Sequence, residues 1–236
     1  MIIYIKMALN KRLIQTSSGI TYNDTTDFFG DGTGLALYEL NNTRQSSENI
    51  ASGTGYGNIG SGGSFSTDSK FGSHSLYVNG GQRASHGMAI GNSSQRSISF
   101  WLKSGNLSDY GSPIEFATGN RAGIVFNNTS GNGTIQGGFY TGSYKMVNTG
   151  QGLSTSSWKH IVFASTSSTN FTIYVNKTAY SYPYGTRNEG LSVGRYIGWG
   201  SNAGYWHGYI DQIRLIDKTV SQSEVNQLYN ESDPNP

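Results

Sequence analysis

The chain has 236 residues, with 33 glycines, 16 tyrosines, no cysteine and only 13% charged residues. Without cysteine there is no disulfide scaffold, thiolate metal site or cysteine nucleophile. The length suits one large β domain, and a composition rich in Gly, Ser, Thr and Asn is typical of short strands joined by turns. An all-α or doubly wound fold is therefore disfavoured.

The formal net charge of +2 is too small to indicate a nucleic-acid or membrane-surface partner. No window approaches about 18 uninterrupted apolar residues, so no membrane insertion is expected. Residues 1–5 are apolar but too short for the core of a signal peptide, and Lys6 interrupts them. Met7 is an alternative start to Met1.

Residues 1–30 are predicted to form an extended N-terminal arm. The charges in its first fourteen residues are Lys6, Lys11 and Arg12, all basic. Because the arm has apolar anchors but too few to form a core, we expect it to dock on another protein, with a solvated tail as the alternative. The expected docking residues are Leu9, Lys11, Arg12, Leu13 and Ile14. A turn at 28–32 then leads into the first strand.

Short strand patterns separated by turn residues follow the arm. The polar, Gly-rich stretch 42–69 reads as a long loop. Strands are then predicted near 74–79, 97–103, 121–126, 135–140, 158–165, 171–176, 191–197 and 207–216. Two antiparallel sheets packed face to face accommodate this many strands. Trp101, Trp158, Phe163 and Tyr174 are predicted to lie in the core between the sheets.

The last predicted strand, 209–216, shows loose alternation of apolar and polar residues. Ile213 and Leu215 are predicted on one face, and Ile210 and Ile216 on the other. A helical period begins directly after it.

That helix carries its own start signal. Ser221 and Glu224 have the Ser-x-x-Glu spacing of a capping box, and Val220 and Val225 occupy the staple positions around it. Val225, Leu228 and Tyr229 then fall on one face at helical spacing. We therefore expect a short helix that lies on a sheet through this apolar stripe.

Six segments in this order resemble the laminin-G-like, concanavalin A-like jelly-roll family. They are LALYELN at 35–41, FGSHSLYVNG at 71–80, SISFWLK at 97–103, WKHIVF at 158–163, FTIYVN at 171–176, and GYIDQIRL with SQSEVNQLY within 208–229. The resemblance implies an all-β fold, a two-sheet antiparallel jelly-roll β-sandwich with a short C-terminal helix. The predicted domains are the arm at 1–30, the jelly roll at 31–232 and a tail at 233–236.

No catalytic residue is assigned, and we expect a non-enzymatic protein. Glucan-cleaving enzymes of this fold carry a Glu-x-Asp-x-x-Glu strand, since retaining hydrolysis needs two carboxyl groups about 5 Å apart, and this chain lacks the motif. Its four histidines lack the neighbours of a helical metal site, and no Gly-x-Ser-x-Gly elbow joins a strand to a helix. For His160 we expect packing and hydrogen bonding.

Some members of the family that this chain resembles hold a calcium ion at the sheet edge. Asp211 matches an Asp of their closing strand that can serve as a ligand of this ion. Calcium takes six to eight oxygens, several of them anionic, whereas Asn41 and Asn42 stand where acidic residues would help. We favour a structural hydrogen-bonding role for Asp211, with a structural calcium ion as the alternative. No other cofactor is expected.

Aromatic residues in the last quarter of the chain are candidates for carbohydrate binding. Flat rings pack against the C–H faces of sugars, and nearby amides and hydroxyls bind their hydroxyl groups. The predicted glycan-binding residues are Tyr182, Tyr184, Trp199, Asn202, Tyr205 and Trp206. The alternative is that these rings close the core or fix their loops.

The basic arm, the missing signal peptide and the single jelly roll resemble virion structural proteins of tailed bacteriophages, as does MALNKRLI at 7–14. The resemblance implies a protein made in the host cytoplasm and displayed in several copies on the virion surface, as a head decoration, head fibre or tail-fibre component. Its expected partners are other virion proteins, through the arm, and host surface glycans. The alternatives are a bacterial lectin-like module and a polysaccharide-degrading enzyme of the same fold.

Overall fold

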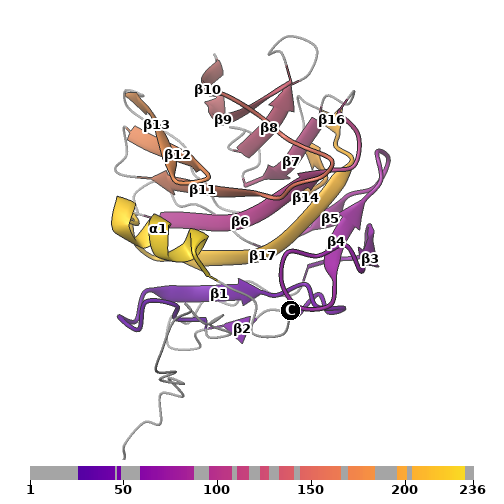
Figure 1. The fold of residues 1–236 in the computed structure, drawn as a ribbon, viewed down its shortest axis with the longest axis horizontal. Helices are drawn as coiled ribbons and strands as arrows, with labels where there is room; N and C mark the ends of the chain where they lie inside the picture. The colour runs from indigo at the N-terminus through magenta and orange to yellow at the C-terminus, as the bar shows by residue number, and fades with distance from the viewer. Residues whose placement is uncertain are drawn as a thin grey trace, which may run out of the picture.

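The computed structural model describes residues 26–45, 47–48, 59–87, 96–107, 111–116, 123–127, 133–140, 144–165, 170–183, 196–200 and 204–231. These residues form two antiparallel sheets, a short two-stranded ribbon and a C-terminal helix (Figure 1). The predicted all-β jelly-roll sandwich with a C-terminal helix is confirmed. No helix within these ranges is both long and apolar enough to cross a lipid bilayer.

The larger sheet has nine strands and carries the helix on its outer face. Its main order is β13-β12-β11-β6-β17-β1-β2, with β4 pairing with β17 and β3 with β4. The strands are β1 (Gly34–Tyr38), β2 (Ser47–Glu48), β3 (Ser64–Ser66), β4 (Ser75–Val78), β6 (Arg96–Ser104), β11 (Lys159–Ser165), β12 (Asn170–Val175), β13 (Thr178–Pro183) and β17 (Gly208–Ile216).

The smaller sheet has six strands in the order β10-β9-β8-β7-β14-β5. Its strands are β5 (Ala84–Ser85), β7 (Gly111–Glu115), β8 (Gly123–Asn127), β9 (Thr134–Tyr140), β10 (Tyr144–Gly152) and β14 (Tyr196–Ile197). The separate ribbon pairs β15 (Trp199–Gly200) with β16 (Gly204–Tyr205). This ribbon lies between β14 and β17 along the chain, so it connects the two sheets.

Each of the eight predicted later strands overlaps an observed one. Sequence patterns missed β5, β7, β10, β13, β15 and β16, and they missed β2 and β3 within the stretch 42–69 that was predicted as loop. A tight turn joins β12 to β13, where Asn176 and Lys177 have φ of 47° and 75°. Two successive residues with positive φ are typical of a tight hairpin turn.

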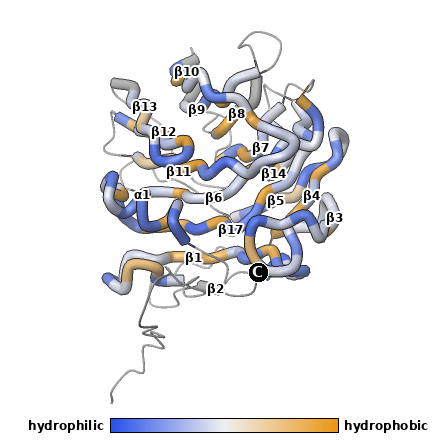
Figure 2. Tube along the Cα trace, viewed as in Figure 1, coloured by the Kyte–Doolittle hydropathy of each residue, from blue (hydrophilic) through white to orange (hydrophobic). Residues whose placement is uncertain are grey.

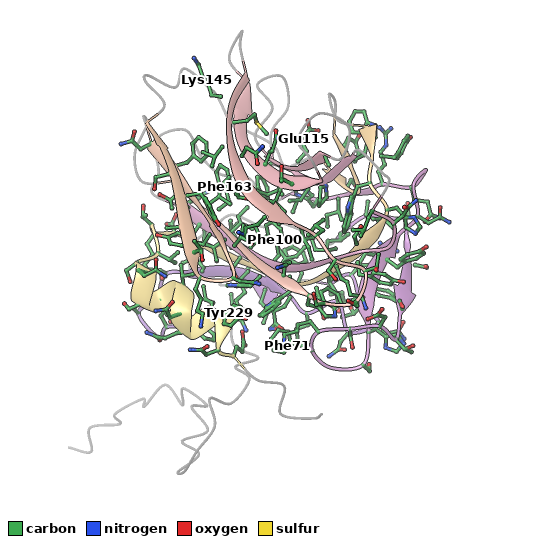
Figure 3. The ribbon with its side chains drawn as sticks, turned by 45° about the horizontal axis from the view of Figure 1, so that its top comes forward. Phe71, Phe100, Glu115, Lys145, Phe163 and Tyr229 are labelled. Atoms are coloured by element: carbon green, nitrogen blue, oxygen red, sulfur yellow. The ribbon has the colours of Figure 1, made fainter. Side chains whose placement is uncertain are left out.

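The core lies between the two sheets. In β6, Ile98, Phe100 and Leu102 are fully buried there, because alternate residues of a strand share a face. Figure 2 shows apolar stretches along strands of the sandwich and hydrophilic stretches in its connections. Figure 3 shows Phe100 and Phe163 within the sandwich, with Tyr229 at the end of the helix outside it.

The helix α1 (Gln222–Tyr229) begins as predicted. The backbone N–H of Glu224 donates to Ser221 Oγ (3.3 Å), and the backbone N–H of Ser221 donates to Glu224 Oε2 (2.7 Å), so the capping box is confirmed. Val225 and Leu228 are buried in an apolar cluster on the outer face of the nine-stranded sheet. The helix therefore covers one end of this face.

The prediction that four strand aromatics lie between the sheets holds only for Phe163. Tyr174 belongs to the cluster beneath α1, and Trp101 lies on the same outer face against Tyr229, with ring centroids 5.6 Å apart. Trp158 is half-buried. Alternation explains the two misplaced strand residues, since each follows a core residue directly in its strand.

A bulge in β17 corrects the predicted faces of that strand. Its pairing with β6 shifts register between Asp211 and Arg214, and Gln212 has φ of 48°. The extra residue brings Ile210 onto the core face together with Ile213. The prediction that Ile210 lies opposite Ile213 is therefore wrong, because strict alternation does not continue through a bulge.

The start and end of the described chain meet on the outer face. Phe28 and Phe29 pack against the cluster beneath α1, so the packed domain begins before the predicted boundary at residue 31. Arg214 lies over the Phe28 ring (4.9 Å) and forms a buried ion pair with Glu231 (2.6 Å). These contacts fix both ends of the domain to the same sheet.

Candidate functional site

Four side chains gather at the β5 edge of the six-stranded sheet, and we call Arg83, Tyr196, Trp199 and Tyr205 the edge cluster. The rings of Tyr196 and Trp199 meet edge to face, with centroids 5.3 Å apart and planes at 84°. The Arg83 guanidinium lies 4.4 Å from the centroid of Tyr196 and 4.9 Å from that of Trp199. Both distances are within the range of attractive cation–π contacts.

The backbone places these side chains together. β14 lies between β7 and β5, and Tyr196 pairs with Ser85 on one side and Glu115 on the other. Gly198, with φ of 82°, then turns the chain into the ribbon, and its N–H donates to the carbonyl oxygen of Pro113 (2.9 Å). Since a side chain is strained at such a φ, glycine is needed at this turn.

The β15–β16 ribbon brings its two aromatic residues to one side. Trp199 and Tyr205 are directly paired across the ribbon, and paired residues of an antiparallel ladder project to the same face. The ribbon rests on β7, because a Cβ on Gly111 would clash with the backbone carbonyl of Tyr205. The ribbon is therefore supported by its packing against β7 of the six-stranded sheet.

Exposure differs among the members of the edge cluster. Arg83 is exposed, Tyr196 and Trp199 are half-buried, and the Tyr205 side chain is 40% exposed. An exposed tyrosine beside a fixed indole and a fixed guanidinium offers a flat apolar surface with hydrogen-bond donors at its rim. This combination suits a sugar ring.

Of the predicted glycan-binding residues, the structure brings Trp199 and Tyr205 together. Trp206 is fully buried in the core, so its prediction as a glycan-contacting ring is wrong. Its indole packs over Gly208, where a Cβ would clash with the ring. The chain crosses between the sheets at this point, and the alternation that exposes Tyr205 turns the next side chain inward.

The side chains of the other predicted binding residues lie outside the described part of the structure. Tyr182 lies on β13, the edge strand of the other sheet, and its side chain is outside the described residues. β13 contacts β10, at the edge of the six-stranded sheet opposite β5. Tyr184 and Asn202 are outside the described residues, as are the docking residues Leu9, Lys11, Arg12, Leu13 and Ile14.

The sequence interpretation missed Arg83 and Tyr196. Tyr196 stands in a predicted strand, where a tyrosine gives no sign of which face it occupies. Arg83 is separated from it by more than a hundred residues of sequence, and only the pairing of β5 with β14 brings the two together. No local sequence signal identifies such a contact.

Asp211 is a buried acceptor of backbone hydrogen bonds. Its Oδ2 accepts from the N–H groups of Lys70 (2.8 Å) and Phe71 (3.0 Å), and its Oδ1 from that of Gln212 (2.8 Å). Asn41 Oδ1 accepts in the same way from Ser73 N–H (2.6 Å). Oδ2 of Asp211 and Oδ1 of Asn41 thus hold the loop before β4 in place.

This arrangement does not fit a calcium ion. Calcium takes six to eight oxygens, and the oxygens of Asp211 and Asn41 already accept amide protons. Within the described part of the chain, no three His, Asp or Glu side chains gather as a metal site would need.

His160 occupies the same outer face and is fully buried. Its Nε2 lies 2.8 Å from Ser99 Oγ, and its ring lies 4.9 Å from that of Trp101. Burial, with smaller contributions from the positive charges of Lys70 and Arg214, lowers the pKa of His160 to about 3. The imidazole is therefore neutral at physiological pH and has a packing and hydrogen-bonding role.

Fold and site together define a β-sandwich of the lectin type, with an aromatic cluster at one sheet edge. The model of the concanavalin A-like lectin/glucanases superfamily, in its laminin G branch, matches residues 84–226. The chain belongs to this superfamily. Comparison with curated proteins finds no match.

Three examples show which solved structures share the fold. One is domain 4 of AbnA, a GH43 extracellular arabinanase from Geobacillus stearothermophilus, in complex with arabinotriose. It is 20% identical to this chain, with a TM-score of 0.62, and the match covers 84% of this chain and 98% of that one. The binding domain of Paraclostridial Mosquitocidal Protein 1 is 15% identical (TM-score 0.64, 83% and 51% covered). The receptor binding domain of botulinum neurotoxin D is 17% identical (TM-score 0.63, 84% and 52% covered). The chain thus spans about half of each toxin domain.

Proposed function

We propose that the chain is a non-enzymatic carbohydrate-binding protein that holds a glycan at the edge cluster. The observation that carries this proposal is the pairing of Trp199 with the 40% exposed Tyr205 on one face of a supported ribbon, beside the fixed guanidinium of Arg83. The rings supply a flat apolar surface, and the guanidinium supplies hydrogen-bond donors.

The solved neighbours add support to this proposal. The arabinanase domain, which this chain matches over 98% of its length, was solved with arabinotriose, and the two toxin neighbours are named for binding. At these identities the likeness concerns the fold, and the glycan site proposed for this chain rests on its own residues.

The non-enzymatic part of the proposal rests on the carboxylates. The sequence lacks the paired carboxylates of glucan-cleaving relatives. Several described carboxylates hold structural partners: Asp31 and Glu224 bind Lys218, Asp68 binds Lys103, Asp217 binds Arg96, and Glu231 binds Arg214. A turnover assay on β-glucans and alginates is expected to release no product, and product formation would overturn this part.

We further infer that the protein is displayed on a virus particle, docked by its N-terminal arm. The place where the described chain begins favours this role. Thr26, the first described residue, lies against Gly34, which pairs with Ile216 at the end of β17, whereas Tyr205 of the edge cluster comes shortly before Gly208 at the start of β17. At about 3.3 Å per residue the two points are about 25 Å apart. An arm docked at one end leaves the cluster free at the other.

The arm is tested by deleting residues 1–25. The truncated protein is expected to bind glycans as the full chain does and to lose its association with particles. Unchanged particle association would contradict docking through the arm. Display in several copies strengthens weak single sites, since avidity raises affinity by about 10² to 10⁴.

The glycan site is tested by isothermal titration of the full chain with a panel of neutral and acidic oligosaccharides. Replacing both Trp199 and Tyr205 by alanine is expected to weaken binding at least tenfold, because each stacked ring contributes about 1 kcal/mol or more. Trp158→Ala, which removes a half-buried ring from the outer face of the other sheet, is the control. Equal losses in both variants would contradict the assigned site.

A further inference from the structure

Arg83 is an exposed residue whose guanidinium is already held in place. It precedes the edge strand β5 and lies over the rings of Tyr196 and Trp199, at 4.4 and 4.9 Å from their centroids. Long side chains lose rotamer freedom when they bind a ligand. Stacking on two rings restricts this side chain before any ligand arrives.

The backbone of Arg83 is fixed from both sides. On one side β5 pairs with β14, which carries Tyr196. On the other side the segment at Gly60–Gly62 approaches closely: Gly60 N–H donates to the Ser85 carbonyl oxygen (2.8 Å), and a Cβ on Gly62 would clash with the Arg83 carbonyl. The side chain therefore projects from an ordered support rather than from a free loop.

Other described arginines donate to oxygen atoms of the protein. Arg44 donates to the carbonyl oxygens of Gly60 and Gly63 (2.9 and 3.0 Å), Arg96 to Asp217 (2.9 Å), and Arg214 to Glu231 (2.6 Å). Arg83 differs from them, since its guanidinium lies over two aromatic rings and forms no hydrogen bond or ion pair with the described residues. Its five N–H donors thus have no described acceptor in the protein.

The chemistry of a stacked guanidinium determines what those donors bind. Stacking uses the face of the planar group and leaves its N–H bonds, which lie in the plane, directed outward. Two parallel N–H bonds match the two oxygens of a carboxylate, and such charge-assisted pairs are about twice as strong as neutral hydrogen bonds. A sugar hydroxyl has one oxygen and no charge, so it cannot accept both parallel N–H bonds as a carboxylate does.

We propose that the edge cluster selects acidic glycans, with Arg83 binding the carboxylate of a uronic or sialic acid residue whose ring packs on Tyr205 and Trp199. This inference rests on the proposed function and names the class of glycan that the site takes. Arg83 then determines specificity, while the rings provide affinity common to acidic and neutral sugars.

The test compares matched acidic and neutral ligands on the full chain. Oligogalacturonates, alginate oligosaccharides and sialyllactose are titrated beside the methyl ester of each acid and beside a sulfated galactan oligosaccharide. The wild type is expected to bind at least one acid about tenfold or more tightly than its ester. Arg83→Gln should lower the affinity for that acid to the affinity for its ester, and should leave the affinity for the ester unchanged. The affinity of Arg83→Lys for the acid should lie between those of the wild type and Arg83→Gln.

Lys177→Gln is the matched control, because Lys177 is an exposed cation 4.5 Å from the ring centroid of Tyr229 on the other sheet. Its affinity for the acid is expected to equal that of the wild type. Equal binding of acids and esters, an equal loss in both variants, or a preference for sulfate over carboxylate would overturn the inference while leaving glycan binding intact. Failure of the wild type to bind any glycan would overturn the proposed function itself and this inference with it.

Discussion

Asp211 shows how much structure one buried side chain holds. Its carboxylate accepts three backbone N–H bonds, from Lys70, Phe71 and Gln212, and so ties the loop before β4 to the central strand β17. Hydrogen bonds to a charged group contribute about 1.5 to 3 kcal/mol each, about twice the neutral value. A carboxylate at this position has a structural explanation that does not need a metal.

Asp211→Asn is expected to lower the free energy of unfolding by about 2 to 4 kcal/mol, since the amide group turns one acceptor into a donor that faces a backbone N–H. Urea denaturation measures the change. The control is Asp217→Asn, whose carboxylate is 47% exposed and pairs with Arg96, and for which a loss below about 1 kcal/mol is expected. Similar losses for the two variants would contradict the role given to Asp211.

His160 makes a prediction about acid stability. Its pKa is lowered to about 3 in the folded protein, against 6.5 for the free side chain, so the unfolded chain binds a proton that the folded chain does not bind between these values. The stabilisation due to neutral His160 is complete above pH 6.5 and is lost as the pH falls towards 3.

His160→Gln is expected to remove this contribution. As the pH falls from 6.5 to 4, the free energy of unfolding should then decrease more steeply for the wild type than for the variant. The two proteins have the same carboxylates, so the difference between their slopes is due to His160. Urea denaturation at several pH values measures the two slopes. Parallel slopes would show that His160 titrates normally in the folded protein.

Among elements, those defined by local chemistry could be predicted and those defined by pairing could not. The cap of α1 depends on Ser221 and Glu224, three residues apart, and it was predicted correctly. The bulge at Gln212 depends on how β17 meets β6, and no residue of β17 indicates it. The meeting of Arg83 with Tyr196 likewise depends on the pairing of two short strands. Half of the candidate site therefore became visible only in the fold.

The ribbon that carries Trp199 and Tyr205 depends on its support by β7. Gly111→Ala places a Cβ against the Tyr205 carbonyl, so the ribbon must shift, and we expect weaker glycan binding and a destabilisation of about 1 to 3 kcal/mol. Gly81→Ala is the control, since its Cβ would meet only Asn79 O, at 3.8 Å, and the change should stay within about 0.5 kcal/mol. Titration and thermal melting measure both effects. Wild-type behaviour of Gly111→Ala would show that the ribbon does not rest on β7.

At the scale of the whole molecule, the two faces of the nine-stranded sheet have different tasks. The inner face forms the core, and the outer face holds the start and the end of the described chain through Phe28, Arg214 and Glu231. Figure 3 shows Phe71 and Tyr229 on this outer side, away from Phe100 and Phe163. Because these ends are fixed at the far end of β17 from the edge cluster, the proposed attachment and the proposed glycan site lie at different ends of this strand.

Glycan binding at the edge cluster can be tested in one experiment, because the chain has four tryptophans. Each indole N–H gives a separate resonance in a nitrogen–proton spectrum, and substitution by phenylalanine assigns each one. On titration with the best oligosaccharide of the panel, the Trp199 resonance is expected to shift, while those of Trp101, Trp158 and buried Trp206 stay in place. A saturable shift at Trp158 or Trp101 with none at Trp199 would contradict the account.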